Sequence, residues 1–222
     1  IRNISLESAS DEEIRDTVKV MGGEDWELWI EELMKRDLLA QGFITTNYTY
    51  IGSEVTWPIY NQGTIGRAKE DLQRAAQAIS QKSSEKKGNA YLAVMKGLVT
   101  QAASAIPGMS VYLSLLFKIM KDKNLHEGCV EQAFRLFSEE LYSGAEINLD
   151  QSGRIRLDNY ELLKEVQDYV SENWTKFNTD TMDRIADFEG YRKDFMQIYG
   201  FDYENVDYDK DVSPDSEMTL YP

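Results

Sequence analysis

Tyr60 and Lys69 are the residues whose types and spacing best suit proton-transfer chemistry in this sequence. A phenol that can release a proton, beside an ammonium that can hold a hydroxylated cofactor, suits hydride-transfer reactions. On one continuous helix, nine positions make about two and a half turns and put the two side chains on opposite faces. They can meet only if Tyr60 precedes the helix. Gly63 supplies a flexible corner, and Thr64 is the expected N-cap of a helix reaching about Lys82.

Two predicted strands flank that helix. Residues 43–51 are rich in β-branched and aromatic side chains, and residues 89–98 form a second apolar run. Strand, helix and strand in this order predict a βαβ crossover with parallel pairing. Ligands bind at the carboxyl ends of such strands. The order of elements therefore places Tyr50–Tyr60 and Leu98–Thr100 at one edge of the sheet.

Helices account for most of the remaining chain. Ser10 and Glu13 form a capping box before a short helix that ends near Val20. A second helix over 25–34 is predicted to bury one face, made of Trp26, Trp29, Ile30 and Leu33. Beyond Thr100, helices are predicted over 102–106, 109–123, 127–142, 158–174 and 181–199. The 127–142 helix should bury an apolar face of Val130, Ala133, Phe134, Phe137 and Leu141, and residues 202–222 should form an acidic tail.

Composition excludes several classes of function. A net charge of −15 over 222 residues argues against a nucleic-acid partner, and the single cysteine excludes an internal disulfide. No apolar run is long enough to span a membrane. We expect a cytoplasmic protein, or a mitochondrial one in a eukaryote.

No metal site is expected, because Cys129 and His126 are the only residues of their types. Residues 148–155 imitate the start of a calcium-binding EF-hand loop. The twelfth position, where a bidentate glutamate is required, is Asn159. A turn around Ser152-Gly153 is the better interpretation.

Several long stretches resemble the trans-2-enoyl-CoA reductases, the family that includes FabV-type enoyl-acyl-carrier-protein reductases. They read YIGSEVTWPIYNQGTIGRAKEDL, LVTQAASAIPGMSVYLSLLFKIMK, LHEGCVEQAFRLF and FEGYRKDFMQIYGFDYENVDYDKDV. The resemblance implies NADH-dependent reduction of the C2–C3 double bond of enoyl thioesters, carried by coenzyme A or acyl carrier protein. It implies Tyr60 as proton donor and Lys69 as a cofactor-binding, catalytic lysine. It also implies a substrate contact at Tyr50 and a dinucleotide contact at Leu98, Val99 and Thr100.

The resemblance further implies an α/β fold, namely the carboxyl-terminal half of a Rossmann-like, short-chain-dehydrogenase-like sheet with an extended helical, substrate-covering portion. Residues 1–100 would complete the dinucleotide-binding domain, 101–200 would form the helical portion, and 201–222 the tail. The glycine-rich phosphate loop that the family carries in its amino-terminal portion has no counterpart in this sequence. We therefore expect this chain to work together with the amino-terminal half of the same enzyme.

A second hypothesis stays open at this point. The chain could be a reductase-derived structural or interaction subunit that has lost catalysis together with its cofactor-binding half. The intact Tyr60/Lys69 pair favours the enzyme, and the missing glycine-rich loop favours the subunit. A general short-chain dehydrogenase acting on carbonyls is disfavoured, because that group spaces its tyrosine and lysine four positions apart.

Overall fold

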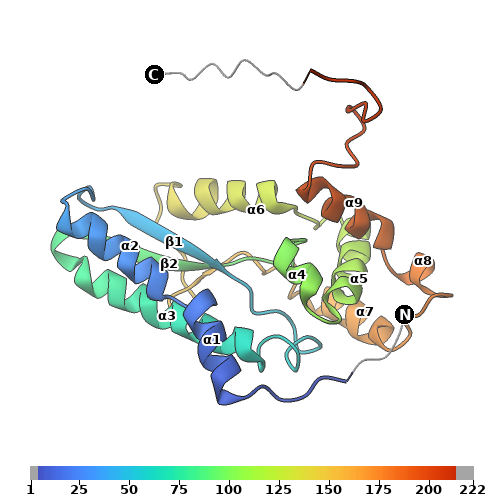
Figure 1. Ribbon diagram of the computed structural model, residues 1–222, viewed down its shortest axis with the longest axis horizontal. Helices are drawn as coiled ribbons and strands as arrows, with labels where there is room; N and C mark the ends of the chain where they lie inside the picture. Colours follow the sequence, from blue (N-terminus) through green and yellow to red (C-terminus); the bar gives the residue numbers. More distant parts are fainter. Residues whose placement is uncertain (1–4, 214–222) are drawn as a thin grey trace.

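The computed structural model describes residues 5–213, which form a short parallel sheet with helices on both sides and a helical portion beyond its carboxyl end (Figure 1). The chain opens with helix α1 (Asp11–Met21). Its capping box is confirmed: Glu13 N donates to Ser10 Oγ over 3.3 Å, and Ser10 N donates to the Glu13 carboxylate over 2.8 Å. The Glu13 carboxyl pKa is lowered, chiefly by the hydrogen bond from the Ser10 backbone.

Helix α2 (Glu24–Lys35) buries a narrower face than its pattern predicts. Ile30 is buried, and Trp26 packs beside it with its indole N–H donating to Thr45 Oγ1 over 3.0 Å. Trp29 is 64% exposed, so its predicted place in the core is wrong. One residue corresponds to about 100° on a helix, so Trp29 is turned away from the line on which Ile30 packs.

The predicted βαβ unit is confirmed. Strand β1 (Ile44–Thr49) pairs in parallel with β2 (Asn89–Val94), in a register that runs from Ile44 opposite Asn89 to Thr49 opposite Val94. Helix α3 (Thr64–Lys82) connects them and buries a face of small and aliphatic residues: Ala68, Leu72, Ala75, Ala76 and Ile79. The N-cap is Gly63, with no side-chain cap, so the assignment of Thr64 as the cap is wrong by one position. A one-turn 3-10 helix (Ser84–Lys86) leads into β2.

Strand β2 ends earlier than predicted, because side chains take the backbone donors that follow it. Lys96 N donates to Gln132 Oε1 over 3.1 Å, and Gly97 N donates to Glu161 Oε2 over 2.5 Å. A short strand β3 (Ile155–Arg156), absent from the expected elements, pairs with β2 and completes the sheet order β1-β2-β3. Ahead of β3 the predicted turn is confirmed: the Asp150 carboxylate accepts from the backbone N–H groups of Ser152 and Arg154.

The helical portion is built around α5 (Met109–Asp122), whose buried residues occur on nearly every side. It packs against α7 (Lys164–Trp174) and α9 (Phe188–Ile198), with the short α4 (Gln101–Ala105) leading into it. The predicted 158–174 helix begins only at Lys164, since residues 159–162 turn to carry Glu161 into the interior. The predicted 181–199 helix is interrupted between α8 (Met182–Ile185) and α9. At the break, Asp187 N donates to Ser114 O, and its carboxylate caps α9.

Helix α6 (Cys129–Arg135) continues into the π-helix η2 (Leu136–Leu141), on the opposite side of the sheet from α3 (Figure 1). The predicted burial of its apolar face is wrong for three residues: Val130 is 77%, Phe134 71% and Phe137 44% exposed. The face turned to the sheet instead carries Gln132 and Arg135. Both donate to the Glu127 carboxylate and to Leu157 O.

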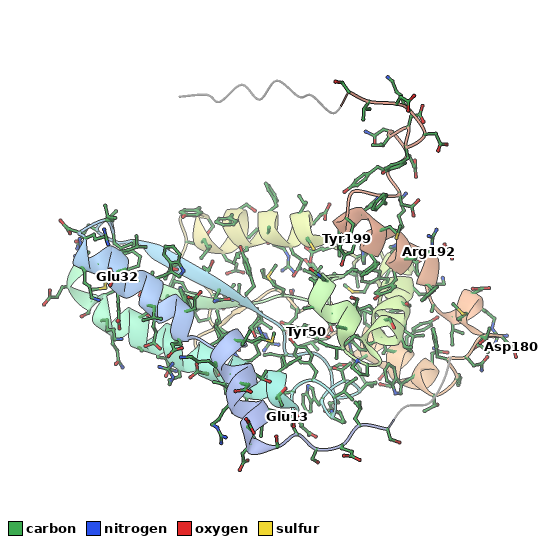
Figure 2. The ribbon with its side chains drawn as sticks, viewed as in Figure 1. Glu13, Glu32, Tyr50, Asp180, Arg192 and Tyr199 are labelled. Atoms are coloured by element: carbon green, nitrogen blue, oxygen red, sulfur yellow. The ribbon has the colours of Figure 1, made fainter. Side chains whose placement is uncertain are left out.

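Three buried clusters hold these layers together. The largest joins α5, α7 and α9 to Val99, a second lies between α2, α3 and β2, and a third joins β2 and β3 to η2. Charged side chains such as Glu13, Glu32, Asp180 and Arg192 lie at the periphery, whereas Tyr50 lies where the sheet meets the helical portion (Figure 2). Residues 202–213 of the predicted tail are irregular, and 214–222 lie outside the described residues. None of the helices within 5–213 is long and apolar enough to cross a membrane.

Candidate active site

Tyr60 reaches the site from a loop of consecutive turns that joins β1 to α3. Tyr60 N donates to Thr56 O over 2.9 Å, and Gly63 N to Tyr60 O over 3.2 Å, which fixes the backbone on both sides of the phenol. Gly66 lets this loop lie directly on the helix, because a Cβ there would fall 1.7 Å from Asn61 O. The predicted break between Tyr60 and Lys69 is therefore confirmed: the tyrosine precedes α3 and the lysine lies in its second turn.

A cavity of about 730 Å³ gathers most of the predicted site residues. Its lining includes Tyr50, Tyr60, Lys69, Leu98 and Thr100, contributed by three separate segments of the chain. The remainder of the wall is largely apolar, with α4 and the start of α5 supplying Ala102, Ala103, Ile106, Pro107 and Met109. The Val99 side chain is absent from this lining and lies in the cluster around α5. The Thr100 hydroxyl accepts from Ala103 N and caps α4.

Burial perturbs both members of the Tyr60/Lys69 pair. Desolvation raises the pKa of Tyr60 to about 12, and it lowers the pKa of Lys69 from its ordinary value. Within residues 5–213, neither Tyr60 Oη nor Lys69 Nζ makes a hydrogen bond or an ion pair. Tyr60 is thus a protonated phenol at neutral pH with its hydroxyl available, and Lys69 is a cation without a fixed partner. Burial is the cause of both pKa shifts.

Tyr50 links Tyr60 to the interior of the protein. Its ring meets the Tyr60 ring edge-on, with centroids 5.1 Å apart and an interplanar angle of 76°. Its hydroxyl donates to Glu161 Oε1 over 2.9 Å. Burial, and then the charge of Glu161, raise the Tyr50 pKa well above its usual range. Glu161 could not be predicted from the sequence, because a lone glutamate near an expected helix start carries no signal of burial.

Lys96 is a second residue that sequence reasoning missed. It is 1% exposed, yet it borders the same cavity, and burial lowers its pKa to about 8. Its ammonium donates to Gly97 O over 2.8 Å and lies 4.9 Å from the centre of the Phe117 ring. His126 packs edge-on against the same ring, and burial followed by the charge of Lys96 lowers its pKa to about 4. His126 is therefore neutral and structural at pH 7.

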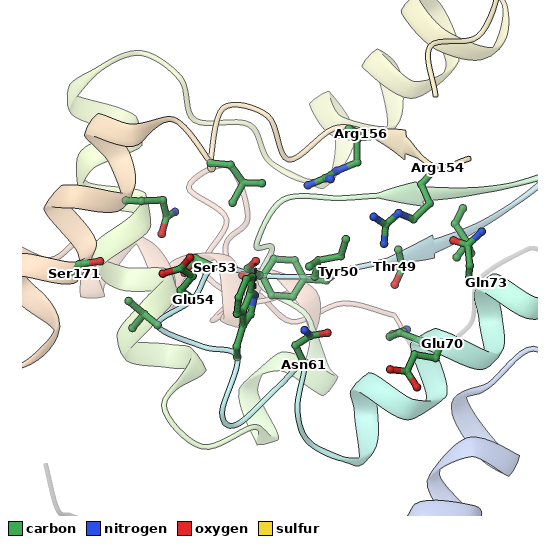
Figure 3. A pocket seen from close by; sticks show the side chains of 18 of the residues that line it. Thr49, Tyr50, Ser53, Glu54, Asn61, Glu70, Gln73, Arg154, Arg156 and Ser171 are labelled. Atoms are coloured by element: carbon green, nitrogen blue, oxygen red, sulfur yellow. Dashed lines mark hydrogen bonds between the residues drawn. The ribbon is translucent and has the colours of Figure 1, made fainter. Parts of the chain in front are cut away.

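A second cavity of about 830 Å³ adjoins the first and shares Thr49, Tyr50 and Lys69 with it. Arg154 and Arg156 lie on one side of it, and Asn61 and Glu70 on the other (Figure 3). Both arginines are ion-paired, Arg154 with Asp150 and Arg156 with Asp150 and Asp158. Lys69 is the cation common to both cavities, so a ligand filling either one would meet it.

Comparison with known proteins identifies relatives over nearly the whole chain. The family model described as the trans-2-enoyl-CoA reductase catalytic region matches residues 1–142, and one described as an enoyl reductase FAD-binding domain matches residues 149–212. An enoyl-[acyl-carrier-protein] reductase [NADH] of Saccharophagus degradans is 49% identical over 99% of this chain and 55% of its own length. A trans-2-enoyl-CoA reductase [NADH] of Ruminiclostridium cellulolyticum is 47% identical over 96% of this chain and 53% of its own.

The solved structures agree. A crystal structure of Clostridium acetobutulicum trans-2-enoyl-CoA reductase in complex with NADH matches with a TM-score of 0.90 and 45% identity, over 94% of this chain and 52% of that one. The Treponema denticola enzyme in complex with NAD matches with a TM-score of 0.89 and 46% identity, over 94% and 52% of the two chains. This chain spans about half the length of the curated relatives it matches.

Proposed function

This chain belongs to the trans-2-enoyl-CoA reductase family, and on that premise we propose that it forms the carboxyl-terminal half of an NADH-dependent reductase of trans-2-enoyl thioesters. The observation that carries the proposal is the single cavity lined by Tyr50, Tyr60, Lys69, Leu98 and Thr100. The proposed sheet is Rossmann-like, with residues 1–100 in the dinucleotide-binding domain, 101–200 in the helical portion and 201–222 as the tail. The non-catalytic subunit is not favoured, because relatives named as reductases align over nearly the whole chain.

The proposed chemistry assigns one task to each side chain. NADH would supply a hydride to C3 of the enoyl thioester, which leaves an enolate. Tyr60, protonated at neutral pH, donates its proton to that enolate. Lys69 faces the cavity with its ammonium unpaired within residues 5–213, a donor set that fits the hydroxyl groups of a nicotinamide ribose. Leu98 and Thr100 would contact the dinucleotide. Tyr50 and the apolar wall formed by α4 and the start of α5 would border the acyl thioester.

We also propose that an amino-terminal half covers two surfaces of this chain. Within the described residues, one edge of β1 has no paired strand, because the sheet order begins with it. Val130, Phe134 and Phe137 form an apolar face on α6 and η2 that is exposed within residues 5–213. The curated relatives carry nearly half their length outside the matched region, which is enough chain to cover both surfaces. The combination of this chain with that half is called the reconstituted enzyme below.

Reconstitution tests the proposal. We expect the reconstituted enzyme to oxidise NADH, followed at 340 nm, when crotonyl-CoA is added. This chain alone should neither turn over nor change NADH fluorescence at micromolar concentrations. A correctly folded reconstituted enzyme without turnover would contradict the proposal. A reconstituted enzyme that shows flavin absorbance near 450 nm and does not need NADH would contradict it as well. Crotonyl-CoA and a crotonyl-acyl-carrier protein, compared in the same assay, would identify the carrier.

A further inference from the structure

Glu161 lies at the centre of a buried cluster of hydrogen-bond donors that the proposed chemistry leaves unexplained. The residue is fully buried, and its carboxylate accepts three bonds: from Tyr50 Oη over 2.9 Å, from Tyr112 Oη over 2.6 Å and from Gly97 N over 2.5 Å. A buried carboxylate is costly unless its lone pairs are satisfied, and three donors converge on this one. Its own backbone is held by Gln167 Nε2, which donates to Glu161 O over 2.7 Å.

Two of these three donors belong to the candidate active site. Tyr50 lines the cavity and its ring supports the ring of Tyr60. Gly97 lines the cavity too, and it begins the segment that continues into Leu98–Thr100. Tyr112, in contrast, lies in the cluster around α5 and lines neither cavity. One carboxylate therefore ties together the surroundings of the proton donor and the segment proposed to contact the dinucleotide.

We propose that Glu161 is a positioning residue for the reduction, which fixes Tyr50 against Tyr60 on one side and the Gly97 backbone on the other. The inference rests on the proposed function and adds a residue to it. Lys96 completes the arrangement from the opposite side, because its ammonium donates to Gly97 O. The Gly97 N–H and C=O are thus held by an acidic and a basic side chain, both buried. A side chain at Gly97 would disturb this, since its Cβ would lie 2.8 Å from Leu113 Cδ2 and 3.5 Å from Tyr50 Oη.

The arrangement also distinguishes the two cavity tyrosines. A phenol has one proton to donate, and Tyr50 donates it to Glu161. Towards the cavity Tyr50 can therefore offer its ring and an acceptor lone pair but no proton. Tyr60, whose hydroxyl has no partner within residues 5–213, retains its proton for the enolate. Glu161 thus fixes which tyrosine acts as donor as well as how the pair is oriented.

Three single variants and one double variant of the reconstituted enzyme test the inference. Glu161→Gln either places an amide N–H against Gly97 N–H, which loses that bond, or turns the N–H groups towards the tyrosines, whose hydroxyls would then have to accept instead of donate. Because either arrangement disturbs the position of Tyr50 or of Gly97 beside the cavity, we expect kcat to fall about 10- to 100-fold, with a rise in the NADH KM. Tyr50→Phe should lower kcat comparably. Tyr112→Phe is the matched control. It removes the shorter of the two tyrosine bonds to the same carboxylate, and its kcat should stay within about threefold of wild type.

The double variant Tyr50→Phe/Glu161→Gln separates positioning from general destabilisation. If Glu161 acts through Tyr50, the loss in kcat for the pair should be clearly smaller than the product of the two single losses. A Tyr112→Phe loss equal to that of Glu161→Gln, or fully multiplicative single losses, would overturn the inference. So would wild-type kinetics in Tyr50→Phe, which is available should Glu161→Gln fail to fold. A Tyr60→Phe enzyme that keeps its turnover would instead overturn the proposed function, so the two failures are distinguishable.

Discussion

Replacing Lys96 by methionine removes a cation that is 1% exposed and whose pKa is lowered from 10.5 to about 8, first by desolvation. In the folded state Lys96 releases its proton at a lower pH than in the unfolded state, so the unfolded state binds more protons between about pH 8 and pH 10.5. The contribution of Lys96 to the unfolding free energy therefore rises with pH in that window. The full difference corresponds to about 3 kcal/mol, of which about 1 kcal/mol should develop between pH 7 and pH 9.

The assay is urea unfolding of wild type and Lys96→Met at pH 7, 8 and 9. We expect the unfolding free energy of wild type minus that of the variant to rise by about 1 kcal/mol from pH 7 to pH 9. The variant also loses the bond to Gly97 O and the attraction of the nearby acidic groups Glu161, Glu127 and Asp194. Those losses change the unfolding free energy of the variant by a similar amount at each pH and alter its slope with pH less. The pH dependence is therefore the diagnostic quantity. If the unfolding free energies of the two proteins changed equally with pH, Lys96 would not have a lowered pKa in the folded state.

Two further substitutions test the core and the loop that carries Tyr60, the proposed proton donor. Leu116→Ala, at a fully buried position on α5, should lower the unfolding free energy by about 2–5 kcal/mol. Leu38→Ala, at a 65% exposed position, should change it by less than about 0.5 kcal/mol. Equal effects of the two substitutions in urea titrations would contradict the burial of Leu116. Gly66→Ala would force a Cβ against Asn61 O and push the Tyr60 loop off α3, so the reconstituted enzyme should lose turnover by about tenfold or more, and an unchanged kcat would contradict that close approach.

The part of the fold that could be predicted is the part fixed by local pattern. The βαβ unit follows from two apolar runs around one long amphipathic segment, and α3 spans its predicted range. Gly63 also indicated that the helix begins after Tyr60, so that Tyr60 precedes the helix and Lys69 lies within it. These features depend on periodicity and on glycine, whose effects act over a few residues.

Contacts between distant segments were beyond prediction. Periodicity marked Val130 and Phe134 as one apolar face, but it does not tell which partner covers that face, and within residues 5–213 both are exposed. The helix expected from Asp158 is replaced by turns because Glu161 meets Tyr50, 111 residues away, a pairing that no local pattern encodes. Lys96 likewise sits within an apolar run, and its burial depends on α5 and α6 packing around it.

Turnover by Tyr60→Phe tests the central claim most directly. The Tyr60 hydroxyl makes no hydrogen bond within the described residues, so its removal should leave the unfolding free energy within about 0.5 kcal/mol of wild type. Loss of the general acid should nonetheless reduce kcat for crotonyl-CoA in the reconstituted enzyme by about 10²- to 10⁴-fold, with little change in NADH binding. A stable Tyr60→Phe enzyme that oxidises NADH at the wild-type rate would contradict the assignment of Tyr60 as the proton donor.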